Sequence, residues 1–180
     1  GIAPGDTVAI TGAGAIGLLG ADAARIRGAG RVIVVGRGQR LAKAAALGFE
    51  TVNTAAGDPV GAVRAMTGGF GVDVALECTG VPEMVEDALE MLRRGGRCAA
   101  VGIPTVGIEI AMQRLVLDEL ELVGCRATAG EMRRVMPFVE SGAMRVREMI
   151  THRFALADYR EALATFNDRS SGAIKIIVRP

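Results

Sequence analysis

A glycine-rich segment near the start of the chain constrains the fold more than any other feature. The apolar run Val8-Ala9-Ile10 is followed by Thr11-Gly12-Ala13-Gly14-Ala15-Ile16-Gly17. This order predicts a strand, a tight turn and a helix whose N-terminus and backbone N–H groups can hold a diphosphate. Gly12 permits the turn, Gly14 lets the diphosphate approach the backbone, and Gly17 lets the helix lie close to the strand. A glycine turn without a ligand is the alternative, and the second strand that follows argues against it.

Beyond this segment, short β-rich runs alternate with helical patterns, which predicts a single α/β domain over residues 1–180 with parallel strands. We expect strands at 7–11, 31–35, 51–53, 72–77, 97–101 and 119–124, with a short one at 108–110 and a C-terminal strand at 173–178. We expect helices at 15–27, 39–47, 59–67, 82–93, 131–140 and 156–166. Pro137 inside the fifth of these predicts a kink or a later start.

Composition excludes several classes of protein. Half of the 180 residues are hydrophobic but only 3% are aromatic, so the core must be aliphatic, as in a parallel sheet covered on both faces. Lys and Arg total 21 against 20 Asp and Glu, and this balance gives no sign of a nucleic-acid partner. The apolar runs are too short to span a bilayer, so we expect no membrane partner.

The three cysteines, Cys78, Cys98 and Cys125, lack the spacing of metal ligands. Reduced thiols in the cytoplasm are the simplest interpretation. The chain opens on Gly1-Ile2-Ala3-Pro4-Gly5-Asp6, a turn that leads straight into a strand. We therefore expect a piece cut at a domain boundary, although a processed terminus would look similar.

The end of the second predicted strand indicates which dinucleotide would bind. A carboxylate at this position holds the adenosine ribose hydroxyls and favours NAD. Here Gly36 occupies the position, and Arg37 and Arg40 follow it. The missing carboxylate removes repulsion against a 2′-phosphate, and two guanidinium groups supply forked donors for it. The sequence thus favours NADP over NAD; the alternative is that both arginines are simply solvated.

Several motifs together resemble the cofactor-binding domain of medium-chain, zinc-type alcohol and polyol dehydrogenases, over nearly all of the chain. Besides the glycine turn, they are Pro4-Gly5-Asp6, Glu77-Cys78-Thr79-Gly80, Val101-Gly102, Ile150-Thr151-His152-Arg153-Phe154 and Gly172-Ala173-Ile174-Lys175. The resemblance implies a doubly wound Rossmann fold, with six parallel strands in the order 3-2-1-4-5-6 and helices on both faces. The zinc-free quinone and enoyl reductase branch usually has Gly-Gly-Val-Gly at the turn, and it remains an alternative.

The resemblance also implies roles for individual residues. The turn that includes Ala15 and Ile16 would bind the diphosphate. Cys78 and Thr79 would lie beside the cofactor, and Lys175 would contact the diphosphate. The backbone of Val101, Gly102 and Ile103 would hold the nicotinamide carboxamide. Gly36 and Arg37 resemble the NADP-using members, whereas Arg40 is a looser match because the loop is one residue shorter than is common.

Each of these roles has a simpler rival. Cys78 would more often be a small buried side chain, and Lys175 could be a solvated strand residue. His152 is the only histidine, but in this family its motif is mainly structural. Arg126 would lie toward the nicotinamide side on a loose alignment. One histidine and three scattered cysteines do not make a zinc site.

The sequence differs from that of the family's zinc-type members at its N-terminal end. Zinc-type members carry an N-terminal domain that supplies the catalytic zinc ligands, the proton relay and most of the substrate pocket, and we expect no such domain within these 180 residues. Zinc would then belong to the parent enzyme and not to this chain, which should bind NADP(H) with little turnover. The resemblance also implies a homodimer, in which the strand near 120–125 pairs with its mate. An ordinary edge strand is the alternative.

Two other functions compete with a dehydrogenase domain. One is a non-catalytic NADP(H)-binding or dimerisation module, which would not need the residues implied on the nicotinamide side. The other is an S-adenosylmethionine-dependent methyltransferase, which also has a glycine-rich turn after its first strand. Such enzymes usually place an acidic residue at the end of the second strand, and Gly36 cannot serve in that role.

Overall fold

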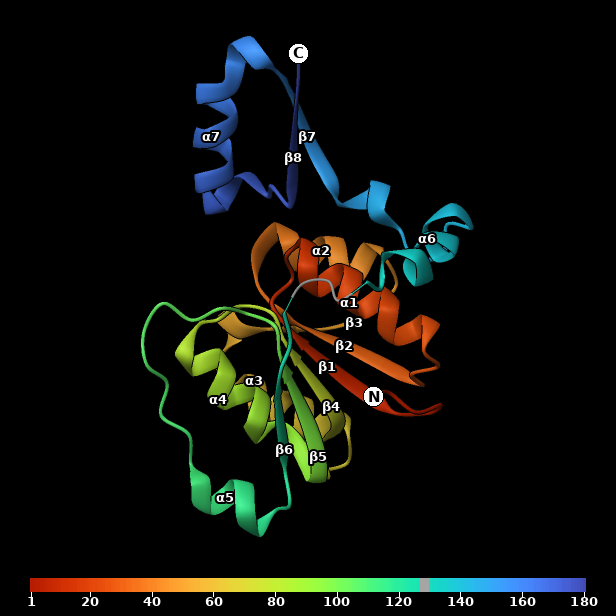
Figure 1. Ribbon diagram of the computed structural model, residues 1–180. Helices are drawn as coiled ribbons and strands as arrows, with labels where there is room; N and C mark the ends of the chain where they lie inside the picture. The colour runs from red at the N-terminus through yellow and green to blue at the C-terminus, as the bar shows by residue number, and fades with distance from the viewer. Residues whose placement is uncertain (127–129) are drawn as a thin grey trace.

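The core of the protein is a six-stranded parallel sheet (Figure 1). The computed structural model describes residues 1–126 and 130–180. The strand order is β3-β2-β1-β4-β5-β6, which confirms the predicted Rossmann topology. The strands are β1 (Thr7–Thr11), β2 (Arg31–Gly36), β3 (Glu50–Asn53), β4 (Val72–Glu77), β5 (Leu92–Ala100) and β6 (Glu121–Gly124). The order reverses direction between β1 and β4, and such a switch point is where open α/β sheets bind ligands.

Helices cover both faces of this sheet, as predicted (Figure 1). They are α1 (Ala15–Ile26), α2 (Gly38–Ala46), α3 (Pro59–Met66) and α4 (Pro82–Glu90), followed by the shorter α5 (Met112–Leu117). Alternate residues of β1 enter different cores: Val8 and Ile10 pack with α1 and α2, whereas Ala9 packs with α3 and α4. This alternation follows from the two-residue period of a strand. We call the cluster that contains Val8 and Ile10 the first core.

The predicted start of the third helix is confirmed. Asp58 precedes Pro59, the first residue of α3, and its Oδ1 accepts a hydrogen bond of 2.8 Å from the Gly61 N–H. The cap satisfies an N–H group that the helix itself cannot pair, and the fixed φ of proline suits the first helical position. Val63 on this helix is fully buried.

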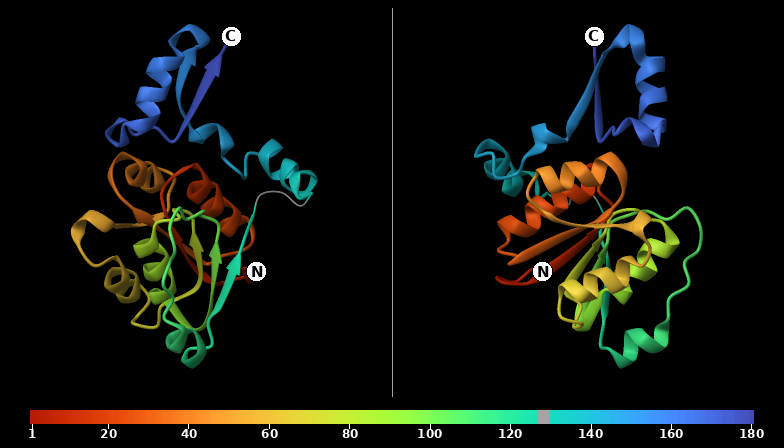
Figure 2. Two further views of the ribbon diagram at one scale, coloured as in Figure 1. Left: turned by 60° about the vertical axis from the view of Figure 1, so that its left-hand side comes forward. Right: turned by 180° about the vertical axis from the view of Figure 1, so that it is seen from behind.

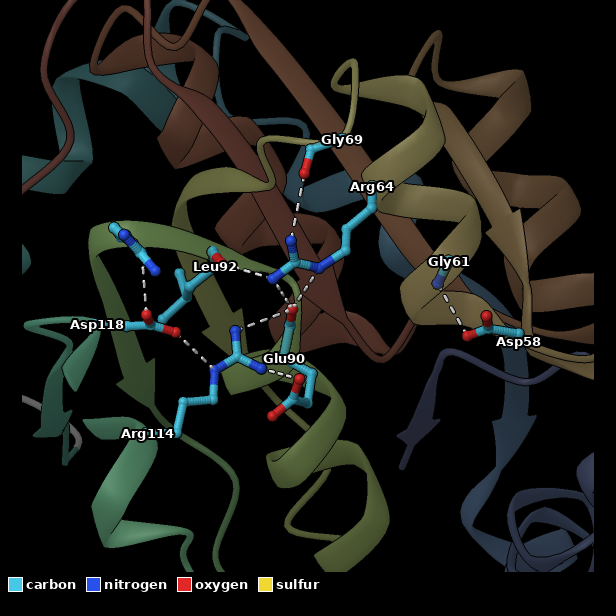
Figure 3. A network of polar contacts seen from close by, with 9 residues as sticks. Asp58, Gly61, Arg64, Gly69, Glu90, Leu92, Arg114 and Asp118 are labelled. Atoms are coloured by element: carbon cyan, nitrogen blue, oxygen red, sulfur yellow. Dashed lines mark hydrogen bonds and ion pairs between the residues drawn. The ribbon is translucent and has the colours of Figure 1, made fainter. Parts of the chain in front are cut away.

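The fourth helix ends earlier than its sequence predicts. We expected it over 82–93, but α4 ends at Glu90 and β5 begins at Leu92, which pairs with Val72 across an irregularity in the ladder. Figure 3 shows the physical reason. The Glu90 carbonyl accepts N–H groups from Arg64 at 2.9 and 3.0 Å and from Arg114 at 3.3 Å. Two guanidinium groups from distant parts of the chain therefore stabilise the end of the helix.

A smaller lobe follows the sheet (Figure 2). It contains β7 (Ile150–Ala155), α7 (Tyr159–Asn167) and β8 (Lys175–Arg179), and α6 (Met132–Glu140) precedes it. The C-terminal strand predicted at 173–178 is thus β8, and it pairs in parallel with β7 in a separate two-stranded sheet. The segment at 108–110, predicted as a strand, has no regular structure, and Ile110 instead packs against the core cluster that contains Ala9. Pro137 lies inside α6.

The smaller lobe is attached to the sheet through α1 and α2. Asp22 of α1 is 1% exposed, and it accepts hydrogen bonds from the Arg145 backbone at 2.9 Å and from the Arg145 guanidinium at 2.5 and 3.0 Å. Met149 and Ile174 complete the first core from the same side. In the part of the chain that the structure describes, no helix combines the length and apolar character needed to cross a bilayer.

Candidate functional site

The turn between β1 and α1 has the geometry expected for a diphosphate cradle. Gly12 has a φ of +97°, and a Cβ at this residue would lie 2.8 Å from Thr79 Cγ2. A Cβ on Gly17 would overlap the Gly12 carbonyl oxygen. Both positions therefore require glycine. A Cβ on Gly14 would meet no atom within 4 Å, so the backbone is open to a ligand at the start of the helix.

Glu77, the last residue of β4, organises the loop beside this turn. Its side chain is fully buried. The carboxylate accepts hydrogen bonds from the Thr79 N–H at 2.6 Å, the Gly80 N–H at 3.1 Å and the Thr79 hydroxyl at 2.5 Å. The Thr11 hydroxyl adds a longer bond at 3.4 Å. Hydrogen bonds of this kind hold a buried carboxylate without a cation. They fix the loop after β4 against the end of β1.

The segment after β5 is joined to the same residue. The Glu77 carbonyl accepts the N–H groups of Val101 at 2.8 Å and Gly102 at 3.0 Å. A Cβ on Gly102 would lie 2.5 Å from Glu77 Oε2. The N–H groups of Val101 and Gly102 are thereby occupied. The side chain of Ile103 is 83% exposed. The structure thus brings the three segments expected around a nicotinamide to one edge of the sheet.

Sequence reasoning missed what Glu77 does. In the sequence analysis Glu77 appeared only as part of the motif Glu77-Cys78-Thr79-Gly80, and no role was predicted for it. The available signal was a carboxylate at the end of an otherwise apolar parallel strand, because such a group needs hydrogen-bond partners when buried. The loop after β4 and the Thr11 hydroxyl supply these partners, while the loop after β5 binds the Glu77 backbone carbonyl. Spacing in the sequence alone could not place the two loops next to each other.

The thiol of Cys78 is expected to be unreactive. Burial raises its pKa to about 12, with a further contribution from the Glu77 carboxylate. The same causes raise the pKa of Cys98 to about 12. Because the thiolate is the nucleophile and the metal ligand, Cys78 stays a neutral neighbour of the turn at physiological pH. Thr79 lies next to Gly12 through its methyl group.

The end of β2 lies on the other side of the turn. A Cβ on Gly36 would lie 3.0 Å from the Ala13 Cβ, so a small residue is favoured here. Arg37 precedes α2 and is exposed, whereas Arg40 is half-buried and its Nε has no hydrogen-bond partner in the described structure. Both arginines line one pocket. An unpaired buried donor is unfavourable unless a ligand satisfies it.

Three further candidates lie away from the glycine turn. Lys175 begins β8, is exposed, and follows Ile174, which belongs to the first core together with Ala13. His152 lies in β7, where its ring stacks on Phe154 with centroids 6.4 Å apart. Arg126 is exposed after β6. The contact between Lys175 and a diphosphate stays a prediction, and the packing of His152 fits the structural role expected for it.

Within residues 1–126 and 130–180, no three His, Cys, Asp or Glu side chains come together in a way that could hold a metal ion. The three cysteines were the sequence's main candidates for metal ligands. All three are free; one is buried, one half-buried and one exposed. The residues present therefore do not fit a zinc site, and no chemical step is assigned to zinc here.

Comparison with known proteins agrees with this geometry. Residues 15–141 match the family model described as zinc-binding dehydrogenase. An alcohol dehydrogenase of Cupriavidus necator is 31% identical over 98% of this chain and 50% of its own length. The sorbitol dehydrogenase of Bacillus subtilis is 30% identical over 98% of this chain and 51% of its own length. The chain thus spans about half the length of the curated relatives it matches.

Solved structures share the fold. A zinc-binding dehydrogenase from Sinorhizobium meliloti, bound to NADP, superimposes with a TM-score of 0.90. It is 32% identical, and the superposition covers 100% of this chain and 54% of that one. The match of the family model over most of the chain, together with the strand order and the glycine turn, leads to one conclusion. This chain belongs to the zinc-binding dehydrogenase family.

Proposed function

We propose that this chain is the NADP(H)-binding half of a zinc-type alcohol or polyol dehydrogenase. The observation that carries the proposal is the end of β2, where Arg37 and Arg40 line a pocket that has no carboxylate in its wall. Neither guanidinium has a hydrogen bond or ion pair to another described residue. A phosphate on the adenosine 2′-hydroxyl matches such forked donors. The Sinorhizobium meliloti relative bound to NADP supports the same choice.

The remainder of the cofactor would be held by residues that follow β1, β4 and β5 and by the first residue of β8. The backbone from Gly12 to Gly17, including Ala15 and Ile16, would bind the diphosphate, with Lys175 as a further contact. Cys78 and Thr79 would form the wall beside the nicotinamide, and the backbone of residues 101–103 would orient its carboxamide. When bound, the nicotinamide supplies or accepts a hydride. This chain binds and orients it, and Glu77 holds the two loops in place.

The reaction of the whole enzyme extends beyond these residues. In the proposal, a hydride passes between the nicotinamide and a secondary alcohol or its ketone. The zinc ligands and the substrate pocket belong to the part of the relatives that this chain does not span. Residues 1–180 alone act as one cofactor-binding domain and should show little or no turnover. The free cysteines support a reducing compartment, and we place the protein in the cytoplasm.

A homodimer is part of the proposal. Among the described residues, β6 lies at the end of the six-stranded sheet and pairs with β5 alone, which leaves its outer edge without a described partner strand. Val123 on this strand is 43% exposed. An unpaired edge can take up a strand from a second copy and so continue the sheet. Sedimentation of the chain at several concentrations tests this step, and a monomer at every concentration contradicts it.

The cofactor assignment is tested by titrating the chain with NADPH and with NADH, by calorimetry or nucleotide fluorescence. We expect tighter binding of NADPH. Hydrogen bonds to charged groups contribute about 1.5–3 kcal/mol, so Arg37→Gln should weaken NADPH binding roughly tenfold or more and leave NADH nearly unchanged. Arg133→Gln on α6 is the matched control, since Arg133 is exposed and does not line the pocket. Equal or tighter binding of NADH would overturn the role of Arg37.

A further inference from the structure

The pocket at the end of β2 has two walls that are far apart in the sequence. One wall comes from the start of α2 and the other from the end of α7 and the 3₁₀ turn η4 (Arg169–Ser171). In Figures 1 and 2 this end of the smaller lobe lies next to α2. The lining residues are Arg37, Gln39, Arg40, Phe166, Asn167 and Arg169. Three of the six are arginines and none is acidic.

The charge of this pocket is not neutralised by the protein. Arg169 is exposed, and its guanidinium group, like those of Arg37 and Arg40, makes no hydrogen bond or ion pair to a described residue. The adjacent Asp168 does not line the pocket, and its Oδ1 accepts the Ser170 N–H at 2.8 Å and the Ser170 hydroxyl at 2.7 Å. These bonds lower the pKa of Asp168. The buried Nε of Arg40 also lacks a partner. The pocket is therefore suited to an anion.

The second wall is held in position by α2 itself. Gln39 Nε2 donates a hydrogen bond of 3.0 Å to the Ser170 carbonyl. Gly172 follows η4 with a φ of +71°, and a Cβ there would lie 3.1 Å from the Gln39 Cβ. The turn that carries Arg169 thus packs directly against the helix that carries Arg40. A residue about 130 positions away in the sequence is thereby fixed at the mouth of the same pocket.

We propose that Arg169 is a specificity-determining residue, a third guanidinium group that binds the 2′-phosphate of NADP(H) from the smaller lobe. The inference rests on the proposed function. Because the ligand would contact both walls, its 2′-phosphate also stabilises the docking of the smaller lobe on α2. By thermodynamic linkage, docking of the smaller lobe on α2 must in turn strengthen binding of the 2′-phosphate.

The test compares two nucleotides that differ in the 2′-phosphate, adenosine 2′,5′-bisphosphate and adenosine 5′-monophosphate, together with NADPH and NADH. We expect Arg169→Gln to weaken binding of the bisphosphate and of NADPH roughly tenfold, as for other hydrogen bonds to charged groups. Binding of the monophosphate and NADH should stay within about twofold. Arg160→Gln is the control, because Arg160 is an exposed arginine of α7 outside the pocket. Arg169→Lys, which keeps the charge, should recover part of the loss.

Two results would overturn the inference. One is an affinity for the bisphosphate that is the same in Arg169→Gln and Arg160→Gln. The other is an equal loss for both nucleotides, which would indicate a structural role. The proposed function fails separately, if the unaltered chain does not prefer the 2′-phosphorylated nucleotides. If that preference exists and Arg37→Gln removes it while Arg169→Gln does not, only the role of Arg169 is refuted. Retained NADH binding shows that each variant is folded.

Discussion

Removing Arg145 should destabilise the protein more than any other substitution on its surface that we describe. The guanidinium of Arg145 lies at the junction of the smaller lobe and the sheet. It donates to the buried Asp22 carboxylate, and its Nη1 donates a 2.7 Å bond to the Leu47 carbonyl. It also lies over the Phe49 ring, 5.1 Å from the centroid. Alanine at this position removes all three contacts.

The size of this loss in stability follows from the burial of Asp22, the partner of Arg145. Asp22 is 1% exposed, and Arg145→Ala leaves its charge with only the backbone N–H of residue 145. Breaking a buried pair by removing one partner costs about 3–5 kcal/mol. Against a total stability of about 5–15 kcal/mol, this is a large fraction. Asp22→Asn in the same chain removes the stranded charge, so the double variant should regain part of the loss.

Urea unfolding followed by circular dichroism measures this directly. Arg147→Ala is the matched control. Arg147 is an exposed arginine of the 3₁₀ turn η2 (Val146–Met149), which directly follows Arg145, and its guanidinium group forms no ion pair with a described residue. It should change the free energy of unfolding by less than about 0.5 kcal/mol. If Arg145→Ala and Arg147→Ala differ by less than about 1 kcal/mol, the argument from the buried Asp22 is refuted.

Two further predictions concern titratable groups. Burial opposes ionisation of Asp73, but hydrogen bonds from Arg93 at 2.6 Å and from the Thr7 N–H at 2.7 Å outweigh it and lower the pKa. A carboxyl group whose pKa is lowered in the folded state stabilises the protein at pH values above the ordinary carboxyl pKa. This stabilisation is lost as the pH falls through the lowered pKa. The stability gap between the unaltered chain and Asp73→Asn should therefore close in acid, and a gap independent of pH contradicts this. Cys78, with its pKa raised to about 12, should react with iodoacetamide at pH 8 far more slowly than the exposed Cys125. Mass spectrometry of labelled peptides measures both rates, and equal rates would disprove the prediction.

The local chemistry of the chain was enough to predict most of the sheet. Glycines with a required backbone shape, capping residues such as Asp58, and the spacing of apolar residues all act within a few positions of one another. They therefore predicted the turn from Gly12 to Gly17, the start of α3 and the positions of the six strands, whereas the order of the strands in the sheet came from the family resemblance. The same reasoning identified Gly36 and Arg37 at the end of β2, because that position follows directly from the strand before it.

Tertiary contacts decided the rest, since they join residues that no spacing connects. The end of α4 is set by Arg64 and Arg114, which reach Glu90 from other helices. The loops after β4 and β5 meet only because the sheet places them beside Glu77. Arg169 reaches the pocket at the end of β2 because the smaller lobe packs on α2. The sequence by itself determined which local elements form and where the glycine turn lies. Only the folded structure decided which distant side chains complete the site.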